Sequence, residues 1–468
     1  MILGFIIYVF LFALIVRQFY VNARDISGNK EAHRLAAVLV ASICIKLLVV
    51  IIWYVNRGDN FDPVWDDTYK YDASGVYFAN QFEQFVFINR RYIETLGAHP
   101  GFHILVGLIY SVYGHAPLMA SAFNVLAVAL FSILAYFIAF HIFGKDVARY
   151  TLIGNLFFPN YIPFEFFLLK DTFVTLGVVF IVWGIYKAAE TQEIYRYLLP
   201  LPAIALLYFF RGELTIILLG ALMLNEAYNC FGVGGSMRKT MTILVFLGFC
   251  LLAGNYLKPS ERTALDRINE VSLGKSAYGG DQLPSFLEGA TGVTDIVSRI
   301  VANPMGFAQY AAKSFFLVLI GPTYFYSQSG AELFYKYGRF IFWDNLTGFV
   351  KIIFAPMVMY GFIHIVKKYR KPAFIIYLFP ALWFCCLLIV QDFFRWLLPA
   401  LPFAIMIGAV GFANFHRIRF FYIPYLLAML CFMVINATRQ DSLAIGAGLT
   451  LVTLAGISLI LLDKRWSS

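Results

Sequence analysis

The chain has 468 residues, of which 61% are hydrophobic and 13% are charged, and its formal net charge is +9. Soluble domains contain roughly 45–50% apolar and about 25% charged residues, so the composition excludes a soluble globular protein. The basic excess does not indicate a nucleic-acid partner. Most Lys and Arg residues lie in short connections between apolar runs, as the positive-inside bias of membrane proteins requires.

Apolar runs of about 17–25 residues recur from end to end, and each is long enough to cross a hydrocarbon core of about 30 Å. Lipid cannot satisfy free backbone N–H and C=O groups, and no barrel-type alternation is present. We therefore predict an all-α polytopic membrane protein, a bundle of about 13 transmembrane helices with interfacial helices in its outer loops. The six cysteines show no C-x-x-C spacing, so neither a disulfide framework nor a zinc site is predicted.

Residues 1–55 are expected to form the N-terminal transmembrane helices, with spans at 2–20 and 35–55. The loop between them contains four basic residues, which places it in the cytoplasm: Arg17, Arg24, Lys30 and Arg34. Residues 56–117 then form an outer acidic loop with an interfacial helix that begins near His99-Pro100-Gly101.

The transmembrane bundle is predicted over residues 118–256. Its spans are expected at 118–143, 147–163, 172–189, 195–211, 213–230 and 239–256. Basic turns at Lys145/Arg149, Lys187/Arg196 and Arg238/Lys239 alternate with outer ends. Residues 159–171 and 211–213 therefore belong on the same outer face as the acidic loop.

Residues 257–344 are interpreted as a long outer loop with interfacial helices, because so long a polar connection is usually a lid or a binding loop. Residues 345–468 are expected to form the C-terminal transmembrane helices. Their spans are predicted at 346–366, 373–390, 396–413, 420–436 and 442–462.

The acidic loop is the strongest candidate for chemistry. Seven of the 27 Asp and Glu residues lie between positions 59 and 94, and Asp66 and Asp67 are adjacent. Desolvation and like charge raise one pKa of such a pair, which suits a general base. The alternative is a merely solvated acidic face.

Further charged residues are expected at outer helix ends. Lys170 and Asp171 suit substrate binding or a mutual surface pair, and Arg211 suits a phosphate contact or an ion pair with Glu213. Arg395 is either a phosphate ligand or a snorkelling residue. His99 and His103, four residues apart, share one helix face and suit hydrogen bonding or lipid-phosphate contact more than metal binding.

Four motifs in order resemble the GT-C superfamily of membrane glycosyltransferases, which use polyprenyl-phosphate-linked sugars. The first is Asp66-Asp67-Thr68-Tyr69, and the second is His99-Pro100-Gly101-Phe102-His103. The third is Phe158-Pro159 with Leu169-Lys170-Asp171, and the fourth is Phe394-Arg395-Trp396-Leu397-Leu398-Pro399. The order of features covers most of residues 55–410. The long loop 257–305 departs from the commonest pattern.

The resemblance implies that Asp66 or Asp67 deprotonates an acceptor hydroxyl in an inverting displacement. Asp171 would position the acceptor, or a divalent cation such as Mg²⁺ or Mn²⁺ if one is used, since no cofactor is certain. Arg395 would hold the donor phosphate. Substrate-binding residues would also include Tyr69, His99, His103, Lys170 and Arg211.

The resemblance also implies a polyprenyl-phosphate sugar donor and a glycan or lipid-linked acceptor, beside membrane lipid. We expect a bacterial inner membrane, with the active site facing the periplasm. One alternative is a polysaccharide repeat-unit polymerase. Another is a lipid-linked-glycan transporter, which should carry ionisable residues in mid-span, whereas the predicted span interiors are nearly free of charge.

Overall fold

The computed structural model describes residues 2–59, 61, 67–84, 100–191, 200–231, 293–307, 350–351, 353–369, 373–387, 398–419, 422 and 425–426. Within these ranges every regular element is an α-helix or a short 3-10 helix, and none is a strand. The prediction of an all-α chain is confirmed for this part. Three described helices are long and apolar enough to cross a membrane: Gly4–Ser27, Asn29–Arg57 and Pro117–Phe143.

The chain divides into two compact units. The first comprises residues 1–157, 161–268 and 398–402, and it contains every predicted site residue that the structure describes. The second comprises residues 158–160, 269–397 and 403–468. Its described helices include α14 (Val293–Ala302), α17 (Phe374–Leu387) and most of α19 (Leu401–Ala413).

Glycines allow two helices of the second unit to pack backbone against backbone. A Cβ on Gly361 would lie 2.0 Å from the carbonyl oxygen of Ile407, and one on Gly411 would lie 2.0 Å from that of Met357. The helix over residues 353–368 therefore meets α19 as closely as two small-residue helix faces do in membrane proteins.

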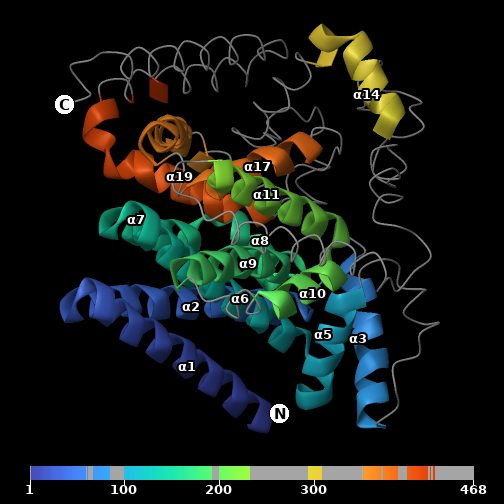
Figure 1. Cartoon of the computed structure of the whole chain (residues 1–468). Coiled ribbons are helices and arrows are strands. Elements are labelled where there is room, and N and C mark those ends of the chain that lie inside the picture. The colour runs from blue at the N-terminus through green and yellow to red at the C-terminus, as the bar shows by residue number, and fades with distance from the viewer. Residues whose placement is uncertain are drawn as a thin grey trace, which may run out of the picture. The chain divides into compact units, whose positions relative to one another are not determined.

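In the first unit, α1 (Ile2–Ser27) and α2 (Asn29–Arg57) form a hairpin joined by Gly28 alone, at a φ of 84°. The two helices lie side by side (Figure 1). The loop conformation predicted between 20 and 35 is therefore wrong, because both helices continue through this segment. Its cytoplasmic location stays a prediction. Large apolar side chains on both helices, among them Phe10 and Val55, are exposed, as a surface facing lipid requires.

Basic residues of the described turns, Lys145, Arg149 and Lys187, make contacts that link neighbouring helix ends of the first unit. Helix α6 (Pro117–Phe143) leads into α7 (Lys145–Phe157) at one of these turns. Three contacts join the turns: Lys145 Nζ to the Ser27 carbonyl at 3.4 Å, Arg149 to Glu31 at 4.0 Å, and Lys187 Nζ to His141 Nε2 at 3.0 Å.

The span predicted at 147–163 is wrong. Helix α7 ends at Phe157, and Pro159 opens a 3-10 turn, η1 (Pro159–Tyr161). Proline disfavours helical geometry in the residue before it, so the helix stops there. The chain continues through the short α8 (Ile162–Phe166) and an irregular stretch into α9 (Asp171–Thr191). We call residues 161–170 the buried connector, because all of them except Ile162 are buried.

The described part of the acidic loop is mainly helical. It contains α3 (Asp67–Glu83), which lies alongside α5 (Pro100–Tyr113), as Figure 1 shows. Helix α5 also contacts α10 (Leu201–Phe210), and α10 is followed by α11 (Gly212–Phe231). The approach of α3 to α5 is close at Gly107, where a Cβ would lie 2.4 Å from the Cβ of Phe78.

We expect Gly107→Ala to destabilise the protein by about 1–3 kcal/mol, the usual cost of overpacking, because the added methyl group forces α3 away from α5. Gly220→Ala is the matched control: it lies inside α11 with no atom within 4 Å of the new Cβ. Alanine there should be neutral, or stabilising by up to about 1 kcal/mol. Thermal unfolding of detergent-purified protein measures both, and equal midpoints would contradict the close approach.

Candidate functional site

Four side chains predicted from sequence form a buried group where three helices of the first unit end or begin. We call Lys170, Asp171, Arg211 and Glu213 the charged cluster. None is more than 7% exposed. Arg211 Nη1 donates to Asp171 Oδ1 at 3.3 Å, and Arg211 Nε lies 3.9 Å from Glu213 Oε1. The surface-pair alternative for Lys170 and Asp171 is therefore wrong.

Helix dipoles favour the two carboxylates of the charged cluster at their positions. Asp171 is the first residue of α9 and Glu213 lies in the first turn of α11, where the positive end of the dipole favours a carboxylate. Arg211 follows the last residue of α10, and its N–H donates to the Leu207 carbonyl at 2.7 Å. The negative end of α10 favours this cation, but Arg211 also precedes the positive end of α11, and Lys170 precedes that of α9. The dipoles therefore account for the carboxylates and not for the cations.

An aromatic group borders the charged cluster and ties it to α5. Phe173 follows Asp171 by two residues, Phe210 directly precedes Arg211, and Phe102 comes from α5. The three ring centroids lie 6.1–6.4 Å apart. A Cβ on Gly101 would lie 2.5 Å from the Phe210 ring, so the glycine of the second motif permits this contact.

The α3–α5 face carries hydrogen bonds that the sequence did not reveal. His103 Nδ1 shares a hydrogen bond with the Ser74 hydroxyl, and its ring centroid lies 4.7 Å from that of Tyr71. About two turns further along α5, the Tyr110 hydroxyl donates to Asp72 Oδ1 at 2.7 Å, and the same Oδ1 lies 2.8 Å from His115 Nε2.

Tyr110 is the fixed donor in this group. Burial, together with the hydrogen bond to Asp72, raises the pKa of the Tyr110 phenol well above its ordinary value. The phenol therefore stays protonated and continues to donate to Asp72 throughout the physiological range. Two side-chain hydrogen bonds, one between Ser74 and His103 and one between Tyr110 and Asp72, thus join α3 to α5.

The predicted residues of the acidic loop differ in their surroundings. Asp67 is the half-buried first residue of α3. Tyr69 is 49% exposed, and its ring lies 4.6 Å from that of Phe61. Asp66, His99 and Arg395 lie outside the described residues. The segment just after Arg395 forms η5 (Leu398–Ala400), which contacts α9.

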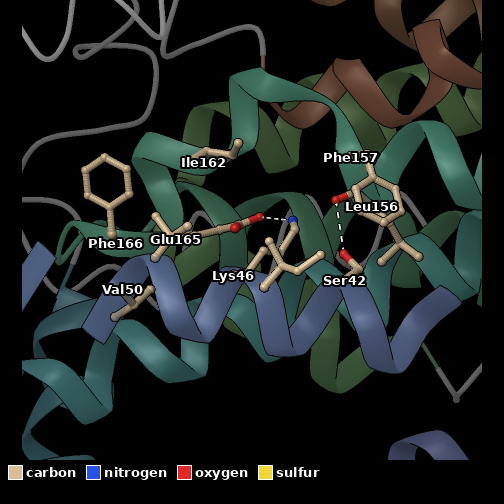
Figure 2. A pocket seen from close by; sticks show the side chains of 10 residues that line it. Ser42, Lys46, Val50, Leu156, Phe157, Ile162, Glu165 and Phe166 are labelled. Atoms are coloured by element: carbon tan, nitrogen blue, oxygen red, sulfur yellow. Dashed lines mark hydrogen bonds and ion pairs between the residues drawn. The ribbon is translucent and has the colours of Figure 1, made fainter. Parts of the chain in front are cut away.

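Sequence reasoning missed a second buried ion pair, between Lys46 and Glu165. Lys46 lies inside the predicted span 35–55, so that span interior is not free of charge. The two side chains point at one another across a pocket of about 70 Å³ between α2, α7 and α8 (Figure 2). The sequence feature that could have indicated this ion pair is a single Lys in one apolar run and a single Glu in another.

A divalent cation does not fit the residues described. Among them, no three side chains of His, Cys, Asp or Glu lie close enough to hold a metal ion. In the charged cluster, the carboxylates of Asp171 and Glu213 flank the guanidinium group of Arg211, which already supplies positive charge. Mg²⁺ instead takes oxygen ligands and water.

Comparison of the chain with protein-family models, with curated proteins and with solved structures finds no match.

A double-mutant cycle tests the pairing of Asp171 with Arg211. We expect Arg211→Gln and Asp171→Asn each to lower the free energy of unfolding by about 3–5 kcal/mol, because each leaves a partner charge buried. The double variant should lose less than the sum. Arg149→Gln, which removes a more exposed ion pair, should cost at most about 1 kcal/mol. Additive losses in the cycle would mean that the two residues are not coupled.

Proposed function

We propose that the chain is a membrane glycosyltransferase of the GT-C type. It transfers a sugar from a polyprenyl-phosphate donor to a lipid-linked or cell-surface glycan acceptor on the non-cytoplasmic face. The described part of the chain supports the coarser premise, an all-helical protein with three helices able to cross a membrane. The proposal extends this to about 13 spans and to a bacterial inner membrane.

One observation carries the proposal: segments from the four motifs, far apart in sequence, join in an unbroken series of contacts. Helix α3, which Asp67 opens, packs on α5, which follows His99. Helix α5 packs on α10, whose end bears Arg211, and α10 packs on α9, which Asp171 opens. Helix α9 in turn contacts η5, three residues after Arg395. A catalytic site built from these motifs requires this convergence.

The proposed reaction is an inverting displacement at the anomeric carbon. The acceptor oxygen forms a bond to that carbon while the carbon–oxygen bond to the lipid phosphate breaks. The phosphate leaves with the electron pair, and the hydroxyl proton passes to Asp66 or Asp67 as general base. Arg395 and Arg211 are assigned to the developing phosphate charge, and electrostatic stabilisation of this kind often contributes most to the rate enhancement of an enzyme.

Lys170, Asp171, Tyr69, His99 and His103 are assigned to substrate. Asp171, held at a helix N-terminus by Arg211, would orient the acceptor hydroxyl. His103 is less accessible than the sequence suggested, since it is buried and bonded to Ser74. Its role would be to fix α3, and with it Asp67, against α5.

The length of α9 is consistent with a site on the side away from the basic turns. Asp171 and Lys187 lie 16 residues apart on this helix, about 24 Å at 1.5 Å per residue. The charged cluster is therefore nearly a hydrocarbon thickness from the basic end. A site on the non-cytoplasmic face follows if that basic end is cytoplasmic.

The transporter alternative gains one observation, since Lys46 and Glu165 form an ionisable pair within a candidate span. Transport pathways use such residues. However, Lys46 and Glu165 form an ion pair with each other. The charged cluster lies at helix ends and not in the middle of a helix. The repeat-unit polymerase shares the need for outer Arg residues and remains the nearer rival.

Asp66→Asn and Asp67→Asn, measured for sugar transfer in membranes at matched expression, test the base. One of them should lose about 10²–10⁴-fold in activity, as a lost general base does, while the other retains most of it. Asp171→Asn should raise the acceptor KM. The readout is consumption of the lipid-phosphate sugar pool.

Asp146→Asn is the control, because Asp146 is an exposed carboxylate at the basic end and should leave transfer unchanged. Normal glycan output from all three site variants would sink the proposal and favour the polymerase or the transporter. Site variants that lose no more activity than Asp146→Asn would contradict the proposal in the same way.

A further inference from the structure

The ion pair of Lys46 and Glu165 lies deep within a candidate span. Lys46 is 11 residues before the end of α2 and 17 residues after its start, about 16 Å and 25 Å along the helix axis. Lys46 is 7% exposed and Glu165 is 1% exposed. An ionisable pair at such depth costs desolvation energy and marks a functional element by default.

Glu165 belongs to the buried connector, whose backbone departs from helical geometry inside the protein. Such backbone is tolerated at membrane depth only where protein groups satisfy it. Where the chain leaves α8, side chains of α6 bond to two of its carbonyl groups: the Ser121 hydroxyl donates to the Phe166 carbonyl at 3.1 Å, and the Asn124 amide donates to the Phe167 carbonyl at 3.0 Å. Glu165 adds a charge contact to α2.

Figure 2 shows Ser42 and Lys46 on one side of α2, where Ser42 contacts α7 and Lys46 contacts α8. Ser42 Oγ donates to the carbonyl of Leu156 at 3.3 Å, one turn along α2 from Lys46. The pocket between them is lined mainly by apolar side chains, such as Val50 and Phe166. Without Lys46, the Glu165 side chain would lose the ion pair that holds the connector against α2, whether its carboxyl group then takes up a proton or leaves the pocket to be solvated.

The connector leads directly into the charged cluster. Lys170 follows Glu165 by five residues, and α9 begins at the next residue. Asn124 links this stretch to the first turn of α9, because its amide donates to the Phe167 carbonyl and its Oδ1 accepts from the Thr172 hydroxyl at 2.9 Å. A displacement of the connector at Glu165 is thus transmitted to Lys170 and Asp171.

We propose that Lys46 and Glu165 are positioning residues, which set the depth at which the buried connector presents Lys170 and Asp171 to substrate. The consequence for sugar transfer rests on the proposed function, but the consequence for the connector's structure does not. Two measurements on the full-length protein in lipid nanodiscs separate them.

The first measurement is amide hydrogen exchange of the peptide covering residues 161–170. Lys46→Met and Glu165→Gln should each speed its exchange about tenfold or more, because the connector opens locally. Lys46→Arg keeps the positive charge and should retain most of the protection. Peptides from α6 should exchange as in the wild type. Arg149→Gln, which breaks an ion pair at the other end of α2 and α7, should leave the connector unchanged.

The second measurement is transfer kinetics on the same variants. A misplacement of about 1 Å can cost roughly a hundredfold in rate, so Lys46→Met should lower kcat by up to that factor and leave the donor KM near the wild-type value. Lys46→Arg should restore most of kcat. A purely structural role would instead lower the amount of folded enzyme without changing its kcat.

Wild-type exchange of the connector in Lys46→Met would overturn the proposal. Equal acceleration over α6 would do the same, since that indicates global destabilisation, and so would an arginine variant as impaired as the methionine variant. If exchange responds as expected but the wild type transfers no sugar, the positioning role stands and the glycosyltransferase proposal fails.

Discussion

A backbone that leaves helical geometry within a membrane protein must find all its hydrogen-bond partners inside the protein, and this constraint shapes the first unit. In the buried connector, Ser121 and Asn124 of α6 donate to the Phe166 and Phe167 carbonyls. The ion pair with Lys46 adds a side-chain contact between the connector and α2. Helices α2 and α6 are also candidate spans. Polar side chains of these two candidate spans therefore bond to the buried connector, which is not itself a span.

The start of α9 follows from this arrangement. Because the connector is held at both ends, Asp171 opens α9 at a fixed level and meets Arg211 from the junction of α10 and α11. The dipoles of α9 and α11 favour the carboxylates of Asp171 and Glu213 at their N-terminal ends. The guanidinium group of Arg211 is buried against both carboxylates, which limits the cost of removing these charges from water.

Local signals were sufficient for the helices with long, uninterrupted apolar runs. The span predicted at 118–143 appears as α6 (Pro117–Phe143), a candidate span, and the helix predicted at 172–189 appears within α9 (Asp171–Thr191). The prediction failed where apolar composition continued through a break in the helix. Residues 147–163 are apolar enough for a span, yet Pro159 divides them. It failed also in the acidic loop, where α3 is too polar to be recognised as a packed helix.

The sequence by itself determined that this is a helical membrane protein and that charged residues mark particular helix ends, because both follow from the transfer of each segment into lipid. Only the tertiary structure decided which charges meet. Lys46 and Glu165 are 119 residues apart, and Asp171 and Arg211 are 40 residues apart. Composition and periodicity describe one segment at a time. A pairing depends on where the irregular backbone between segments finds its partners, and this is a property of the packed chain alone.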